Sequence, residues 1–277
     1  MSDVNNLFQL DSIYCGDNLV ILKKFPSESV DLIYIDPPFF TNKDLKSIIR
    51  NKNKIRSFVD KGWDDIDNYI EWIKPRIQEL YRILKKEGTF YHHCDYRTNA
   101  HIRILLDQIF GRKNFRNEII WAYSGGGIPK RDLPRKHDTI FRYSKSNKWT
   151  FNVQYRPYGD WIKSHTPRHS LTSGGKLLDL KLGTPINDWW ADMTKLTSYH
   201  SEWLGYPTQK PEALLKRIIK ISSNKGDIVL DAFCGSGTTV SVAKKLQRHF
   251  IGIDISYDAC KITAERINYP APKIIRI

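Results

Sequence analysis

The chain has 277 residues, of which 40% are hydrophobic and 27% charged, a composition typical of a globular protein with an apolar core. No run approaches eighteen consecutive apolar residues, which excludes a membrane-spanning helix, and the first residues lack the basic-then-apolar layout of a signal peptide, so we expect a cytoplasmic protein. Lysine and arginine total 44 against 30 aspartates and glutamates, and the net charge of +14 indicates a polyanionic partner.

The positive charge is concentrated in two runs. Seven basic and two acidic residues lie between 40 and 61, and ten basic and three acidic residues lie between 112 and 148. A solvated surface would explain one such run. Two runs, the second of them interleaved with aromatic residues, favour a nucleic-acid surface. The aromatic residues are Trp121, Tyr123, Phe141, Tyr143 and Trp149.

Cysteine and histidine give no sign of a covalent or metal framework. Cys15, Cys94, Cys234 and Cys260 lie far apart without a CxxC pair, so we predict reduced thiols rather than disulfides or a zinc ribbon. The cluster His92–Asp95 contains metal-capable side chains, but neighbours on a strand point to opposite faces. We therefore predict no metal site.

In the N-terminal part, strand and helix periodicities alternate. The pattern predicts a strand over 30–35, a helix over 66–84, a strand over 88–94 and a helix over 99–110. Residues 118–123 and 139–144 have the pattern of an antiparallel pair. From about 150 to 204 the periodicity is weak and Trp, Ser, Gly and Pro are frequent, which indicates an inserted, loop-rich recognition segment.

The C-terminal third has the clearest pattern. A helix over 211–222 precedes a short apolar strand over 228–233, a helix opened by glycines, a strand over 249–256 and a helix over 257–267. This alternation predicts an α/β fold with a doubly wound, mostly parallel sheet. We divide the chain into an N-terminal part of the catalytic domain (1–149), the recognition insertion (150–204) and a C-terminal part of the catalytic domain (205–277).

The glycine-rich stretch DAFCGSGTT, residues 231–239, lies between a predicted strand and a predicted helix. Gly235 and Gly237 would let the backbone approach a ligand at the helix N-terminus. No Lys-Ser/Thr pair follows and the third glycine of a dinucleotide fingerprint is absent. Asp254 ends the next strand, where an acid can bind ribose hydroxyls. The pattern favours a nucleoside cofactor without a pyrophosphate over a tight turn without a ligand.

A second acid ends a strand in the motif DPPF, residues 36–39. Pro37 and Pro38 fix the backbone and remove two N–H donors, so the carbonyls beside Asp36 are free to accept. This arrangement suits an exocyclic base amine, and Phe39 offers a stacking face worth on the order of 1–3 kcal/mol. A turn that happens to contain an acid is the alternative for the motif alone.

Together, DPPF and DAFCGSGTT resemble the catalytic and cofactor-binding motifs of the S-adenosylmethionine-dependent DNA amino-methyltransferases, the DNA methylase N-4/N-6 family. The catalytic motif comes first, which is the circularly permuted order of the beta group. Four further stretches resemble the family, namely GDNLVILKKFPSESVDLIYIDPPF, LLDQIFGRKNFRNEIIWAYSGGG, YPTQKPEALLKRII and RHFIGIDIS. The second of these is typical of type III modification subunits and their smaller relatives, and from the chain length we expect a standalone enzyme.

The resemblance implies a permuted Rossmann-like methyltransferase fold that binds S-adenosylmethionine. It implies that Asp36 and the Pro37 carbonyl accept the two N–H bonds of the target amine, with Pro38 and Phe39 in the same catalytic loop. It further implies a cofactor-binding set of Asp17, Thr208, Lys210, Asp231, Phe233, Gly235, Gly237, Thr238 and Asp254. In this set Asp17 would bind the adenine amine, Asp231 the ammonium, Asp254 the ribose, and Thr208 with Lys210 the carboxylate. A helix cap at Asp17 and a plain surface lysine at Lys210 are the alternatives.

Adenine N6 in double-stranded DNA is the expected target, because related cytosine-amine enzymes tend to carry Ser where this chain has Asp36. Cytosine N4 is the alternative, as are a non-catalytic DNA-binding protein on the same scaffold and an RNA or glutamine-amide methyltransferase. The base must leave the duplex, and residues 41–61 are candidates to close over it. A homodimer and a cognate restriction endonuclease are compatible with the resemblance. Candidates for base contacts are Arg156, Lys163, Arg168 and Lys176.

Overall fold

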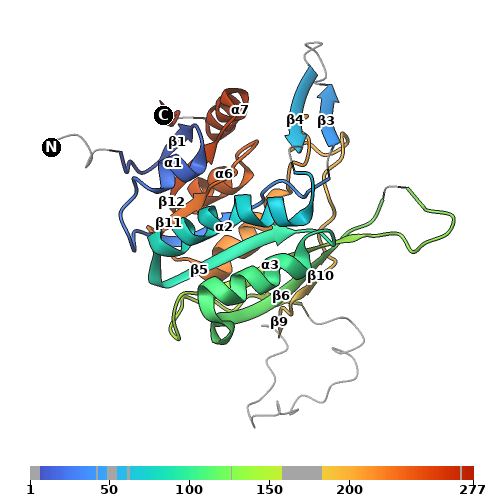
Figure 1. The fold of residues 1–277 in the computed structure, drawn as a ribbon, viewed down its shortest axis with the longest axis horizontal. Coiled ribbons are helices and arrows are strands. Elements are labelled where there is room, and N and C mark those ends of the chain that lie inside the picture. Colours follow the sequence, from blue (N-terminus) through green and yellow to red (C-terminus); the bar gives the residue numbers. More distant parts are fainter. Residues whose placement is uncertain are drawn as a thin grey trace, which may run out of the picture.

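A nine-stranded sheet lies between two layers of helices in the computed structural model (Figure 1). The structure describes residues 7–41, 43–48, 55–60, 63–125, 127–157, 183–268 and 270–277. No helix within these ranges is both long enough and apolar enough to cross a membrane.

The sheet is doubly wound and mostly parallel, as predicted. Its order is β10-β6-β7-β5-β2-β11-β12-β1-β13, and β7 runs antiparallel to both of its neighbours. The strands are β1 (Ser12–Cys15), β2 (Val30–Ile35), β5 (Leu84–Cys94), β6 (Phe115–Ala122), β7 (His137–Ser144), β10 (Trp189–Trp190), β11 (Ile228–Asp231), β12 (His249–Asp254) and β13 (Lys273–Arg276).

Alternation along the strands builds a separate apolar core on each face of the sheet. In β2, Leu32 packs into one core and Ile33 into the other, and both are fully buried. One face is covered by α1 (Asn18–Leu22), α2 (Ile66–Ile83) and α3 (Asn99–Leu106). The opposite face is covered by α5 (Glu212–Ser222), α6 (Thr238–Lys245) and α7 (Tyr257–Ile267).

Helix α2 illustrates how local sequence specifies an element. The Asp65 side chain accepts a hydrogen bond from the Asn68 N–H and caps the first turn. Tyr69, Ile73 and Ile77 recur at helical spacing and are fully buried against the sheet. After α3, the predicted helix widens into a π turn (Asp107–Gly111) and then tightens into a 3-10 turn (Arg112–Asn114) before β6 begins.

Three short strands of the main sheet were not expected from the sequence. They are β1 and β13, which pair in parallel at one edge, and β10, which pairs with β6 at the other edge. Each has two to four residues, too few for alternation to show. The antiparallel pair expected over 118–123 and 139–144 is confirmed as β6 and β7.

Two segments stand apart from the main sheet. The first contains β3 (Lys43–Ile48) and β4 (Ile55–Asp60), an antiparallel hairpin that directly follows the DPPF loop (Figure 1). The second is the pair of β8 (Tyr155–Arg156) and β9 (Thr184–Pro185), which lies within residues 150–204, where the sequence predicts a recognition insertion. Of its base-contact candidates, Lys163, Arg168 and Lys176 lie outside the described residues.

The winding of the sheet reverses between β2 and β11. These strands are parallel neighbours, but the helix after β2 (α2) covers one face and the helix after β11 (α6) covers the other. Connections that diverge in this way leave a crevice at the carboxyl ends of the two strands, which is where ligands bind in doubly wound folds. Asp36 follows β2 and Asp231 ends β11, so both predicted motifs meet at this crevice.

Candidate active site

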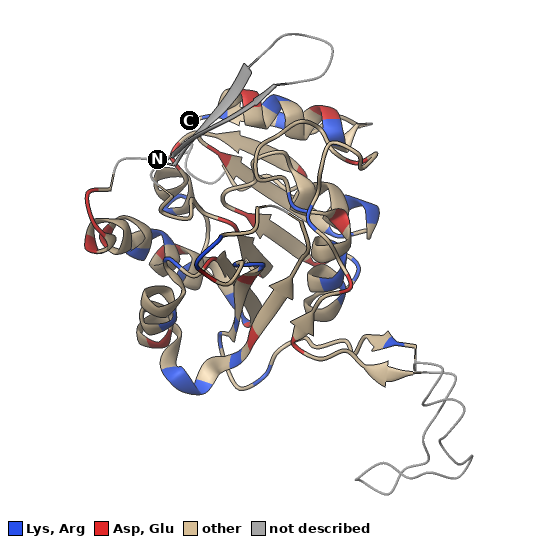
Figure 2. Ribbon diagram, turned by 90° about the vertical axis from the view of Figure 1, so that its right-hand side faces the viewer, with Lys and Arg blue, Asp and Glu red and all other residues tan. Residues whose placement is uncertain are grey.

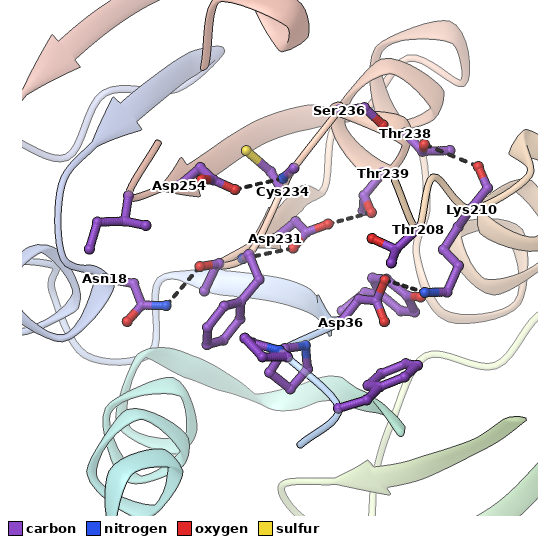
Figure 3. A pocket seen from close by; sticks show the side chains of 18 of the residues that line it. Asn18, Asp36, Thr208, Lys210, Asp231, Cys234, Ser236, Thr238, Thr239 and Asp254 are labelled. Atoms are coloured by element: carbon purple, nitrogen blue, oxygen red, sulfur yellow. Dashed lines mark hydrogen bonds and ion pairs between the residues drawn. The ribbon is translucent and has the colours of Figure 1, made fainter. Parts of the chain in front are cut away.

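A pocket of about 320 Å³ occupies this crevice (Figure 3). Asp254 and Asn18 lie at one end of it, Asp36 and Lys210 lie at the other, and Asp231 lies between them. All of the predicted catalytic and cofactor-binding residues line this pocket except Gly237. The catalytic and glycine-rich loops, nearly two hundred residues apart in the chain, therefore face one cavity.

Asp36 presents one paired and one unpaired oxygen. Its Oδ2 lies 2.5 Å from Nζ of Lys210, and the carboxylate is 16% exposed. Its Oδ1 is buried and has no hydrogen-bond partner within the described structure; Nδ1 of His93 is 4.0 Å away. An unsatisfied buried acceptor is unfavourable by about 1–3 kcal/mol, and a ligand N–H entering the pocket would relieve this penalty.

The two aromatic residues after the prolines diverge. The Phe39 ring lines the pocket, 4.9 Å from Nζ of Lys210. Phe40 adopts a φ of 57° and packs against Trp63 and Tyr69. A positive φ is strained for a bulky residue, and such strain persists only where packing enforces it. The packing of the partly buried Phe40 ring thus fixes the turn that presents Phe39.

Asp231 is held deep in the pocket wall by two hydrogen bonds. The Phe233 N–H donates to Oδ1 at 3.0 Å, and the Thr239 hydroxyl donates to Oδ2 at 2.5 Å. Burial raises the pKa of Asp231 to about 7, although both hydrogen bonds act in the opposite direction. A cationic ligand would favour the ionised form of this carboxyl group.

Asp254 anchors the glycine-rich loop. Its carboxylate accepts from the N–H groups of Gly235 and Ser256, each at 2.8 Å, and burial raises its pKa. Gly235 has a φ of 51°, and a Cβ there would approach the Tyr206 ring to 3.2 Å. Glycine at this position therefore keeps the backbone of the loop close to the pocket.

Gly237 has a different role from the one predicted. It has a φ of 75°, and a Cβ there would lie 2.5 Å from Cγ2 of Thr263, which is a steric clash. This glycine is required by the packing of α6 on α7 and does not line the pocket. Thr238, next in the chain, does line it and donates a hydrogen bond to the backbone carbonyl of Lys210 at 3.1 Å.

Asp17 lines the pocket, as predicted, and also caps a helix, which was the alternative that the sequence allowed. Its Oδ1 accepts from the N–H groups of Leu19 and Val20 and so caps α1. Its Oδ2 accepts from Arg76 at 2.8 Å, and Arg76 also stacks on the Trp72 ring at 4.4 Å. Asp17 still lines the pocket, so the cap holds it there.

Lys210 and Thr208 come from the segment that precedes α5. Nζ of Lys210 contacts Asp36, so the predicted methionine-carboxylate partner is paired with the catalytic-loop acid in this structure. Thr208 lines the pocket with a φ of 64°, a strained backbone conformation for a non-glycine residue. Strained backbone of this kind concentrates at functional sites.

Several residues of the site were not predicted, although the sequence contains a feature that could have identified each of them. Arg76 occupies a core-facing position of α2, one residue before the buried Ile77, where an arginine needs a partner. Tyr34 precedes Asp36 by two residues, and period two would have placed both on one side of the strand. His93 was considered only as a metal ligand. The described residues contain no group of three or more metal-ligating side chains.

The carboxylates and the apolar surface of the pocket fit a cationic nucleoside. Three acidic side chains, Asp17, Asp231 and Asp254, face it, and apolar surface comes from Trp72, Phe233 and Ile255. Carboxylates can accept from hydroxyl and amine groups, while the apolar surface can cover a planar base. Asp36 adds an unpaired acceptor at the other end, which can receive an N–H from a second ligand.

A family model described as DNA methylase matches residues 30–265. The chain belongs to this N6/N4 DNA methylase family. It is 34% identical to DNA adenine methyltransferase YhdJ of Escherichia coli, over 96% of this chain and 87% of that protein. It is 32% identical to type II methyltransferase M.HpaI of Haemophilus parainfluenzae, over 92% of this chain and 74% of that protein.

Among solved structures, the cytosine-N4-specific PvuII DNA methyltransferase has the same fold, with a TM-score of 0.67 at 17% identity. The match covers 95% of this chain and 94% of that one. The family establishes the enzyme as a DNA methyltransferase, and the target base requires a separate argument.

Proposed function

We propose that this DNA methyltransferase transfers a methyl group from S-adenosylmethionine to N6 of adenine in double-stranded DNA. The observation that carries the proposal is the unpaired, buried Oδ1 of Asp36, a residue that lines the same pocket as the glycine-rich loop. An exocyclic amine supplies the N–H donor that this oxygen lacks.

The carboxylates and apolar side chains of the pocket suit S-adenosylmethionine, which supplies an electrophilic sulfonium methyl group when bound. We assign the ammonium to Asp231, the ribose hydroxyls to Asp254 and the adenine amine to Asp17. Phe233 offers a face to the cofactor's adenine ring. The carboxylate is assigned to the Thr208–Lys210 segment, where Thr238 helps to hold the backbone.

At the other end of the pocket, Asp36 and its loop would act on the target base. Oδ1 of Asp36 and the Pro37 carbonyl accept the two N–H bonds, which makes the amine lone pair available for in-line attack. Phe39 stacks on the extruded base. Lys210 is paired with Oδ2, which leaves Oδ1 as the oxygen that would accept from the amine.

The DNA would lie over the edge of the sheet from which the pocket opens. The loop 123–136, between β6 and β7, starts at this edge because β6 runs in the same direction as β5. It projects away from the sheet in Figure 1 and points toward the viewer in Figure 2. Its charged residues are Lys130, Arg131, Asp132, Arg135 and Lys136, a net positive set that suits a phosphate backbone.

Base specificity rests on Asp36 and on the relatives. A carboxylate at this position is the acid expected for adenine, and the relative with 34% identity is named an adenine methyltransferase. The likeness to the cytosine-N4 enzyme, at 17% identity, concerns the fold. Target-sequence recognition is assigned to residues 150–204, including Arg156.

The test combines base identification with a matched pair of variants. Purified protein is incubated with methyl-labelled cofactor and unmethylated DNA, which is then hydrolysed to nucleosides and analysed by mass spectrometry. We expect N6-methyldeoxyadenosine from the wild type, none from Asp36→Ala, which removes the acceptor oxygen, and wild-type yield from the exposed Asp64→Ala. Label in N4-methyldeoxycytidine, or full activity of Asp36→Ala, would contradict the proposal.

A further inference from the structure

A buried chain of polar side chains extends from Asp36 across the neighbouring strands β5 and β7. Nδ1 of His93, on β5, lies 4.0 Å from Oδ1 of Asp36 and 2.7 Å from the Tyr34 hydroxyl. Nε2 of His93 lies 3.1 Å from Oδ2 of Asp138, on β7. The Tyr123 hydroxyl donates to Oδ1 of Asp138 at 2.9 Å. The chain thus leads from the pocket to the partly exposed Tyr123.

The partners of His93 select one tautomer of its ring. Although burial acts in the opposite direction, the hydrogen bond and charge of His93, the charge of Lys210 and the hydrogen bond from Tyr123 lower the pKa of Asp138, so this carboxylate is ionised and can only accept. Nε2 must therefore carry the proton. Burial raises the pKa of Tyr34 well above its ordinary value, so its neutral hydroxyl donates to Nδ1. The lone pair of Nδ1 is therefore shared with the Tyr34 hydroxyl, and Oδ1 of Asp36 lies 4.0 Å from the same nitrogen.

We propose that His93 receives, through Asp36, the proton that leaves the target amine, an inference that rests on the proposed function. As the nitrogen–methyl bond forms, the methyl–sulfur bond breaks and its electron pair stays on sulfur. The amine proton passes to Oδ1 of Asp36 and then to Nδ1 of His93, whose lone pair becomes free as the Tyr34 hydroxyl turns away. Asp36 returns to its carboxylate form, paired with Lys210, while the imidazolium lies between two carboxylates.

The geometry explains why Asp36 needs such a partner. A proton that stayed on Asp36 would remove the negative partner of Lys210, whose Nζ lies 2.5 Å from Oδ2. The His93 ring is fully buried and is enclosed by Phe39 and Trp121 as well as by the polar groups. Bound DNA would restrict water at this site, so an internal acceptor supplies the route that solvent does not.

The chain itself offers a matched control one residue away. His92 is equally buried, but it points to the opposite face of β5 beside Phe90, and neither of its ring nitrogens has a hydrogen-bond partner in the described structure. Burial lowers the pKa of His92 to about 3, so it stays neutral. His93→Gln and His92→Gln therefore remove the same side chain from equally buried positions, and only His93 belongs to the chain.

Single-turnover methylation is measured against pH with saturating cofactor and DNA. The ionisable groups that face His93 are Tyr34, Asp36 and Asp138, with Lys210 and Tyr123 behind them. We expect His93→Gln to be about 100-fold slower than His92→Gln at neutral pH. The wild-type rate should fall as pH is lowered, because a protonated His93 cannot accept, and this acidic limb should be missing in His93→Gln.

Each outcome separates the two proposals. No methylation by the wild type overturns the proposed function, whereas normal wild-type activity with equal rates in both variants overturns only the role of His93. A pH-independent loss in His93→Gln, with the acidic limb retained, indicates a purely structural role. A readout without turnover is the ¹⁵N spectrum of the labelled imidazole, which should show His93 with its proton on Nε2; a proton on Nδ1 would overturn the inference even if the variants fail to fold.

Discussion

Asp231→Asn should stabilise the protein at alkaline pH while it weakens cofactor binding. The wild-type carboxyl group is fully desolvated, and burial raises its pKa from an ordinary value of 3.8 to about 7. A raised pKa means that the folded state binds the proton more tightly than the unfolded state, so stability is lost as pH rises from about 4 to 7. The difference between these two pKa values corresponds to a loss of about 4 kcal/mol of folding stability at pH 8.

The asparagine variant carries no such penalty. Its amide can accept from the Phe233 N–H and donate to the Thr239 oxygen, so both hydrogen-bonding partners are kept. Urea unfolding of the cofactor-free protein should give a variant more stable than the wild type by up to about 4 kcal/mol at pH 8, with the gap closing toward pH 4. A pH-independent gap, or a less stable variant at pH 8, would refute the reasoning.

Three further outcomes are expected. Cofactor affinity of the wild type should rise with pH through about 7, since the ionised Asp231 pairs with the ammonium; calorimetry between pH 6 and 8 measures this, and a flat profile contradicts the assignment. Gly237→Ala should lower thermal stability, because of the clash with Thr263 and the positive φ, by about 1–3 kcal/mol; an unchanged melting temperature would contradict that packing argument. Replacing Lys130 and Arg131 by Ala should reduce the slope of log affinity for DNA against log salt by about 2, and an unchanged slope would place the DNA elsewhere.

The elements that the sequence predicted well are those whose periodicity is long or whose composition is extreme. β2 coincides with the predicted range 30–35, and α7 coincides with 257–267. β1 and β13 were not predicted, because four residues show too little alternation and because their pairing depends on partners far along the chain. Edge strands of this kind are defined by the sheet rather than by their own residues.

The same division holds within the site. Asp36, Asp231 and Asp254 were predictable because each acid ends an apolar strand, and parallel strands end at one edge of a sheet. Pairing between side chains was not predictable: no spacing rule joins Lys210 to Asp36 across 174 residues. Likewise, alternation placed His92 and His93 on opposite faces, but only the three-dimensional structure shows that His93 lies beside two carboxylates.

The pocket between β2 and β11 can bind a ligand only after these two strands have paired during folding. The two strands that bear the pocket are separated by nearly two hundred residues, so neither half of the chain can assemble it alone. A ligand that touches both strand ends ties the first third of the polypeptide to the last. Occupancy should therefore raise the barrier to global unfolding instead of protecting one local region, and slow amide exchange should spread through the whole central sheet when the pocket is filled.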